Sequence, residues 1–155
     1  WLSGDTDFEL GGMHFRLRHV GPAHSEEDLV LYAEEEGVLF TGDLIFKGRV
    51  PFVGDADSKL WLKALDKLIA LNPKVLVPGH GGASDTPMQD LTLTRDYLLF
   101  LRTEMGRAVN DLIPFEEAYE KTDWSRYEMM PAFLEANRRN AYNTYILMEK
   151  ESVSK

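Results

Sequence analysis

Four short segments rich in apolar residues lie near the start of the chain, and their lengths are typical of strands. They span residues 8–10, 13–20, 29–32 and 38–40. The second segment alternates apolar and polar positions, as a strand with one solvated face does. Gly11-Gly12 separates the first two segments, which is a hairpin signal, and an acidic turn that ends at Gly37 joins the last two. The pattern therefore predicts two pairs of neighbouring strands.

The hydrophobic spacing then changes to that of a helix. The apolar residues at helical spacing are Leu60, Trp61, Ala64, Leu65 and Leu68. Asp57 or Ser58 can cap this helix, and Asn72-Pro73 ends it. Residues 74–77 form another short apolar strand. A strand, a helix and a strand in succession predict an α/β layered domain.

The second half of the chain is predicted to be helical. Thr86 to Gln89 has the form of a capping box with Pro at the first helical position, and an apolar stripe follows from Leu91 to about Val109. Pro114 starts a shorter helix, and Pro131 starts a last helix that ends near Glu149. The core candidates of the last helix are Phe133, Leu134, Ala141, Tyr145 and Met148. Residues 1–82 are thus a sheet-and-helix part and residues 83–155 a helical part of one domain.

Composition narrows the classes of function. The 155 residues suit a single domain and carry a net charge of -9. An acidic chain without clustered Lys and Arg is not expected to bind nucleic acid or an anionic membrane surface. No cysteine is present, which excludes thiolate metal sites and disulfides and leaves the cellular compartment open. No apolar run approaches the ~20 residues that span a bilayer.

Three segments share one arrangement, in which an apolar strand enters a turn of small residues that carries a metal-ligating side chain. The ligands are His24 after Gly21-Pro22-Ala23, Asp43 after Thr41-Gly42, and His80 between Gly79 and Gly81. Loops beyond the strand ends of an α/β sheet gather functional groups, and small residues let the backbone approach an ion. Two imidazoles and one carboxylate suit zinc or another first-row metal. Each segment alone also fits a structural turn, but together they predict a metal site.

Three charged residues near these segments have two interpretations each. Lys47 and Arg49 follow the predicted Asp43 strand and could bind a substrate anion, or they are solvated surface charges. Asp28 could support His24, or it is an ordinary turn carboxylate.

The order and spacing of the three segments resemble the later motifs of the metallo-β-lactamase superfamily. The residues that carry the resemblance are Ala23-His24-Ser25, Thr41-Gly42-Asp43-Leu44-Ile45-Phe46 and Val77-Pro78-Gly79-His80-Gly81, with the Trp61 helix between the last two. The resemblance covers roughly residues 8 to 110. It implies an α/β fold, namely the C-terminal half of an αββα metallo-β-lactamase sandwich with added C-terminal helices.

The resemblance also implies a function and a ligand assignment. It places His24 on one metal ion, Asp43 as a bridge between two ions and catalytic residue, and His80 on the second ion. Zinc is the implied metal, and iron serves related folds in oxygen and sulfur redox chemistry. The segments Asn137 to Tyr142 and Tyr145 to Glu149 resemble a subgroup of zinc hydrolases associated with quinoprotein oxidation and sulfur metabolism.

One signature of that superfamily, His-x-His-x-Asp-His, does not occur in these residues. Of the remaining histidines, His14 is expected to face solvent, and His19 either lies behind His24 or has a plain core or surface role. The ligand set is then incomplete and one sheet face is apolar and uncovered. We expect the N-terminal half to come from a separate chain or to be replaced by self-association, or the sequence to be a fragment, as a start at Trp1 also suggests.

The leading hypothesis is a metal-dependent hydrolase of a small-molecule substrate, present as an incomplete fragment that alone is inactive. The alternative is a degenerate, non-catalytic half-domain that acts through association with itself or a partner chain. A third hypothesis, an unrelated α/β domain, requires the three candidate ligands to lie far apart. Substrate choice depends on loops and on the absent half, so it stays open.

Overall fold

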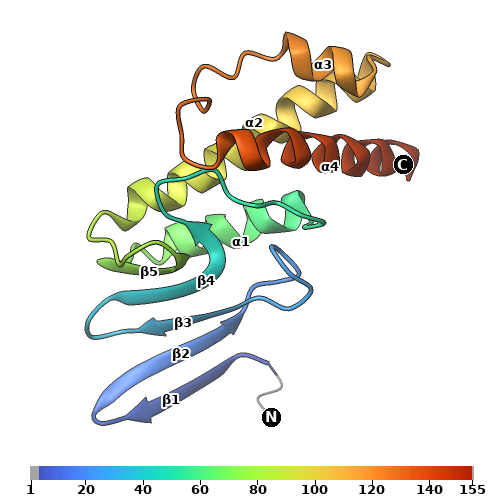
Figure 1. Ribbon diagram of the computed structural model, residues 1–155. Coiled ribbons are helices and arrows are strands. Elements are labelled where there is room, and N and C mark those ends of the chain that lie inside the picture. The colour runs from blue at the N-terminus through green and yellow to red at the C-terminus, as the bar shows by residue number, and fades with distance from the viewer. Residues whose placement is uncertain (1–3, 155) are drawn as a thin grey trace.

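Five strands form one sheet whose order follows the chain. The computed structural model describes residues 4–154. The strands are β1 (Thr6–Leu10), β2 (Met13–His19), β3 (Leu29–Ala33), β4 (Val38–Phe46) and β5 (Val75–His80). Neighbouring strands pair antiparallel from β1 to β4, and β5 lies parallel to β4 (Figure 1). β2, β4 and β5 therefore run in the same direction, and their carboxyl ends lie along one rim of the sheet.

The two predicted strand pairs are confirmed, but β4 is longer than predicted. The sequence predicts a turn at residues 41–43, whereas the strand continues to Phe46 with two irregularities in its pairing to β5. Gly42 allows this because its φ of 52° is in the left-handed region, where a glycine inserts a bulge without reversing the chain. The predicted turn is wrong, and Asp43 lies inside a strand.

Four helices follow the predicted order. They are α1 (Ser58–Ala70), α2 (Pro87–Asn110), α3 (Phe115–Lys121) and α4 (Phe133–Val153). Asp57 caps α1, because its carboxylate accepts hydrogen bonds from the backbone N–H groups of Lys59 and Leu60 at 2.9 and 3.0 Å. Within residues 4–154, no helix combines the length and apolar character that a membrane span requires.

Two details of the helix predictions are wrong. Thr86 does begin α2, but its side chain makes no capping hydrogen bond; its hydroxyl lies 3.2 Å from that of Ser84. Leu134 is 90% exposed and is not a core residue. The buried residues of α4 begin with Phe133 and recur every three to four positions along the helix. Leu134 therefore lies on the face of α4 that is exposed to solvent.

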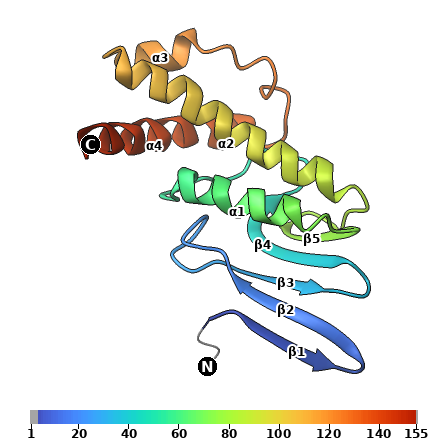
Figure 2. The same cartoon turned by 180° about the vertical axis from the view of Figure 1, so that it is seen from behind.

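The helices cover one face of the sheet. Figures 1 and 2 show α1 beside β4 and β5, with α2 and α4 stacked beyond α1. Val30, Leu39 and Leu76 point to this side from three strands and are buried in one hydrophobic core with Trp61 and Leu65. This packing fixes β4 and β5, the two central strands of the candidate site.

The opposite face carries large apolar side chains that remain exposed. Cross-strand pairs such as Leu10 with Met13 place these side chains on a common face. The set with more than a third of its surface exposed is Phe8, Leu10, Met13, Leu29 and Phe40, called the apolar sheet face below. Exposed apolar patches of this kind mark surfaces that bind a partner.

Candidate functional site

The three predicted ligands come from the rim where β2, β4 and β5 end. His24 lies in the loop after β2, Asp43 lies in β4, and His80 is the last residue of β5. Of these, Asp43 and His80 are brought together. His80 Nε2 lies 3.4 Å from Asp43 Oδ1, and both side chains are about half exposed. A carboxylate and an imidazole therefore meet at a surface that solvent can reach.

The closeness of Asp43 and His80 depends on the backbone of β5. A Cβ on Gly79 would overlap Asp43 Oδ1 and would lie 2.6 Å from the carbonyl carbon of Gly42. No side chain other than hydrogen fits there unless Asp43 moves. Beyond it, the Lys47 N–H donates to the His80 carbonyl at 3.0 Å, which extends the pairing of the two strands to the rim.

His24 is separated from His80 by one aromatic ring. The Phe46 ring stacks on the His80 ring with a centroid distance of 4.4 Å and an interplanar angle of 9°. The same Phe46 ring lies 5.7 Å from the His24 ring, which also meets the edge of Trp61 at 5.1 Å. Trp61 is fully buried, and its indole N–H donates to the Leu44 carbonyl at 3.2 Å. His24 is thus held against the core by Trp61 and Phe46.

Asp28 fixes the loop that carries His24. One carboxylate oxygen accepts the backbone N–H groups of Ala23 and Ser25 at 3.2 and 2.8 Å, and the other accepts the Ser25 hydroxyl at 2.9 Å. The turn-carboxylate interpretation of Asp28 is therefore confirmed. Because the accepted groups flank His24 on both sides, the same turn also sets the position of the His24 backbone.

The side chains at this rim are of the types that bind metal ions, but fewer of them lie together than a metal site needs. Imidazole and carboxylate are ligands of zinc and other first-row metals. Across residues 4–154, however, no group of three or more His, Asp or Glu side chains is close enough to hold a metal ion. The adjacent Asp43 and His80 supply two donors, and the third candidate, His24, lies beyond Phe46. A zinc site usually takes three or four protein ligands, and the two adjacent side chains among residues 4–154 are fewer than that number.

The remaining candidates lie in different surroundings. His14 is exposed, as predicted, and lies at the start of β2, away from the rim; its Nδ1 is 2.5 Å from Glu35 Oε1. This contact raises the pKa of His14 above 6.5 and lowers the pKa of Glu35 from 4.5 to about 2.

His19 is half-buried, and its Nε2 has no hydrogen-bond partner. Lys47 Nζ donates to the Ala83 carbonyl at 3.1 Å, so this ammonium binds the loop after β5.

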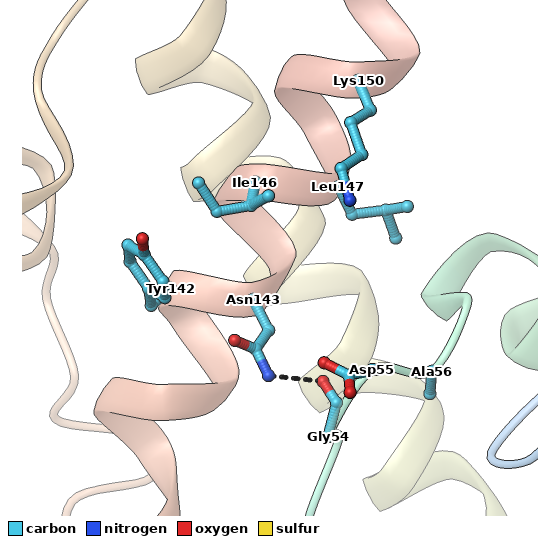
Figure 3. Close-up of a pocket in the computed structure, with 8 residues that line it drawn as sticks. All are labelled: Gly54, Asp55, Ala56, Tyr142, Asn143, Ile146, Leu147 and Lys150. Atoms are coloured by element: carbon cyan, nitrogen blue, oxygen red, sulfur yellow. Dashed lines mark hydrogen bonds between the residues drawn. The ribbon is translucent and has the colours of Figure 1, made fainter.

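Sequence reasoning missed the asparagines of α4 that hold the loop between β4 and α1. Asn140 is 1% exposed; its amide oxygen accepts the Val53 N–H at 2.9 Å, and its amide nitrogen donates to the Pro51 carbonyl at 2.6 Å. Figure 3 shows Asn143 donating to the Gly54 carbonyl, at 2.6 Å, beside a cavity of about 330 Å³ that no histidine lines. The detectable signal was an asparagine on the buried side of a helix, which requires polar partners.

Comparisons with known proteins agree with this architecture. The family model described as Metallo-beta-lactamase superfamily matches residues 2–80, half of the chain. A Metallo-beta-lactamase type 2 from Bacteroides fragilis is 32% identical over 88 residues, which are 54% of this chain and 35% of that protein. The solved structure of a Metallo-beta-lactamase from Pontibacter korlensis is 30% identical, with a TM-score of 0.56 over 63% of this chain and 47% of that chain.

A more distant structure also matches the helical part. The sec-alkylsulfatase Pisa1 from Pseudomonas sp. has a TM-score of 0.71 over 94% of this chain and 25% of that chain, and at 17% identity this likeness shows the fold alone. The chain spans 35% of the length of the Bacteroides fragilis protein. It spans 28% and 23% of two further curated relatives, a Beta-lactamase-like protein 2 homolog from Drosophila melanogaster and a Linear primary-alkylsulfatase from Pseudomonas sp.. The family match, these likenesses and the α/β architecture lead to one conclusion: the chain belongs to the metallo-β-lactamase superfamily.

Proposed function

We propose that this chain contributes part of the active site of a metal-dependent hydrolase that uses zinc. The observation that carries the proposal is the contact between His80 Nε2 and Asp43 Oδ1, 3.4 Å apart at the exposed rim of the sheet. Asp43 would bridge two ions, His80 would bind one of them, and His24 would bind the other. These assignments rest on the family resemblance together with that contact.

Bound zinc supplies a Lewis acid that lowers the pKa of water to ~7 and so provides a nucleophile for hydrolysis at neutral pH. The residues of this chain contribute position. Phe46, stacked on His80, fixes the plane of that imidazole, and Gly79 leaves room for the Asp43 carboxylate beside it. The half-exposed Asp43 and His80 leave access for a small-molecule substrate.

The remaining ligands must come from outside a single copy of residues 4–154, because within one copy those residues form no group of three metal-binding side chains. We propose that a second polypeptide layer covers the apolar sheet face and supplies them. Its source is either a separate N-terminal half or a second copy of this chain. Burial of Phe40 and its neighbours on that face would provide the binding energy, at about 25 cal/mol per Å² of apolar surface removed from water.

Zinc binding tests the ligand assignment. The purified chain should bind zinc weakly, as measured by competition with a chromophoric chelator, and elemental analysis should find zinc rather than iron. His80→Ala or Asp43→Asn should weaken zinc binding by about tenfold or more, the effect of losing one ligand or its support. His14→Ala is the matched control, because this exposed histidine is away from the rim, and its zinc affinity should equal that of the wild type. Unchanged affinity in both site variants would remove Asp43 and His80 from the site.

The second candidate function is a non-catalytic half-domain that acts through association. The incomplete ligand set and the exposed apolar sheet face favour it. The two functions differ in one measurement. The hydrolase gains stoichiometric zinc and hydrolytic activity when its partner layer is added, whereas the half-domain binds its partner without gaining either.

A further inference from the structure

A cavity of about 330 Å³ opens between α4 and the loop that joins β4 to α1 (Figure 3). Asp55 lines it from the loop, and Tyr142, Ile146, Leu147 and Lys150 line it from the helix. The candidate metal ligands are not among its lining residues. Small-molecule pockets measure about 300–1,000 Å³, so this cavity is of a size that suits a small ligand.

Two opposite charges line the cavity without being paired. Asp55 carries a carboxylate on the loop side, and Lys150 carries an ammonium on the helix side. Within residues 4–154, neither side chain forms an ion pair or a hydrogen bond. Figure 3 shows the Lys150 side chain extending along α4 toward the loop that carries Asp55. Charges in a concave surface focus the electric field there, so this pair favours a ligand that carries both signs of charge.

The helix side of the cavity also offers an apolar surface. Asn143, Ile146, Leu147 and Lys150 are spaced by three, four and seven positions from the first, which places them along one side of α4. Ile146 and Leu147 are half-buried, and the neighbouring Tyr142 is 48% exposed. An aliphatic group that packed against these side chains would lose contact with water, which favours binding.

Hydrogen bonds fix the loop side of the cavity relative to the helix. The Asn143 amide nitrogen donates to the Gly54 carbonyl at 2.6 Å, directly before Asp55. Asn140 holds the same loop through the Pro51 carbonyl and the Val53 N–H. Because the two walls are joined in this way, the cavity is formed before a ligand enters, which lowers the entropy lost on binding.

We propose that this cavity binds a small zwitterion with an apolar side chain, which is the chemistry of a free aliphatic amino acid. The ammonium group of the ligand lies against Asp55, its carboxylate lies against Lys150, and its aliphatic group packs on Ile146 and Leu147. The four-carbon stem of Lys150 lets the ammonium adjust to the carboxylate. The proposal does not depend on the proposed function, because the cavity shares no residue with the candidate metal ligands.

Nuclear magnetic resonance with three matched probes tests this proposal on the purified chain without metal. The probes are leucine, 4-methylpentanoate, which is leucine without its ammonium group, and 3-methylbutylamine, which is leucine without its carboxylate. Leucine should shift the Asp55 backbone amide and the Asn143 side-chain amide in a saturable way. It should bind about three- to fivefold more tightly than either other probe, since each of those lacks one exposed ion pair.

Two variants assign the charges of the ligand to the two walls. Asp55→Asn should abolish the preference for leucine over 4-methylpentanoate, and Lys150→Gln should abolish the preference for leucine over 3-methylbutylamine. Asp111→Asn and Lys63→Gln are the matched controls, because they remove an exposed carboxylate and an exposed ammonium that do not line the cavity, and they should keep both preferences.

Three results would overturn the proposal. They are the absence of a saturable shift with leucine, equal affinity of the wild type for the three probes, and retention of both preferences in Asp55→Asn and Lys150→Gln. The comparison of the probes on the wild type decides the question even if a variant fails to fold.

Discussion

At the scale of single residues, the candidate site depends on two glycines, Gly42 and Gly79, as well as on its polar side chains. Gly42 is needed for its backbone conformation, with a φ of 52° that lets β4 bulge and continue. Gly79 is needed for space, because a Cβ there would overlap the Asp43 carboxylate. Two glycines with different physical roles thus bring Asp43 and His80 to 3.4 Å.

Substitution of Gly79 tests this dependence. Gly79→Ala should push the Asp43 carboxylate away from His80 and weaken zinc binding by about tenfold or more. Overpacking should also lower the free energy of unfolding by about 1–3 kcal/mol, as measured by urea denaturation. Gly82→Ala is the control, since nothing lies within 4 Å of its added Cβ, and it should change neither quantity. Equal zinc affinity in both variants would show that the position of Asp43 does not depend on Gly79.

At the scale of elements, α4 acts on the site from a distance. Its asparagines bind the loop between β4 and α1, and that loop carries Phe52 against Phe46 and so next to His80. Asn140 is also bonded to Tyr97 of α2, whose hydroxyl receives its amide hydrogen at 2.9 Å. The buried polar network therefore joins two helices and the site loop in one arrangement.

Removal of the Asn140 amide should destabilise the domain strongly. Asn140→Ala leaves the Val53 N–H and the Pro51 carbonyl without partners in a buried environment, which should cost about 2–4 kcal/mol of unfolding free energy. Thermal unfolding monitored by circular dichroism should show a melting temperature lower by about 5–12 °C. Asn143→Ala, which loses one hydrogen bond at a partly exposed position, should cost about 1 kcal/mol. A similar loss in the two variants would argue against the Asn140 network.

The acidic turn between β3 and β4 carries Glu35, which forms an ion pair with His14 of β2. The strength of this ion pair depends on pH. The pKa of Glu35 is lowered by this pair, so its ionised carboxylate stabilises the folded state. That stabilisation is fully present above pH 4.5, the ordinary pKa of a glutamate, and is lost as the pH falls toward about 2. The pKa of His14 is raised by the same pair, so the stabilisation from its protonated ring is fully present below pH 6.5 and is lost as the pH rises through the raised pKa. Both groups are therefore charged and stabilise the folded state between pH 4.5 and pH 6.5.

Glu35→Gln tests the pair directly. Without the carboxylate, the main cause of the raised pKa of His14 is gone, and the pKa should fall toward 6.5. Nuclear magnetic resonance titration of the imidazole protons measures this shift. Glu36→Gln, an exposed neighbour in the same turn, should leave the pKa of His14 where it is in the wild type. A His14 pKa that does not move in Glu35→Gln would exclude this ion pair in solution.

At the scale of the whole molecule, local patterns predicted the elements and the meeting of Asp43 and His80 at one rim of the sheet. Gly11-Gly12 specified a hairpin, and the spacing around Trp61 specified α1, because both signals depend on nearest neighbours. The continuation of β4 through Asp43 and the place of Phe46 between the histidines were not predictable. They depend on how β4 packs against β5 and α1, which involves residues distant in sequence.

The sheet is covered on one side only, and this asymmetry sets the last prediction. Apolar side chains such as Phe40, 40% exposed, and Leu10, 67% exposed, would be removed from water by a second layer. In the absence of a separate N-terminal half, the purified chain should self-associate through this face. Sedimentation velocity at increasing concentration should then show a reversible shift to larger species.

A charge placed on the face should abolish that shift. Phe40→Lys puts an ammonium where association would bury it without a partner, so the variant should remain monomeric at concentrations at which the wild type associates. Leu134→Lys is matched in charge and is made at an apolar residue that is 90% exposed on α4. Both variants change the net charge of -9 in the same direction, so they reduce general electrostatic repulsion equally. If both variants dissociate to the same degree, the association is not through the sheet; if the wild type stays monomeric, a second copy of this chain is not the layer that covers it.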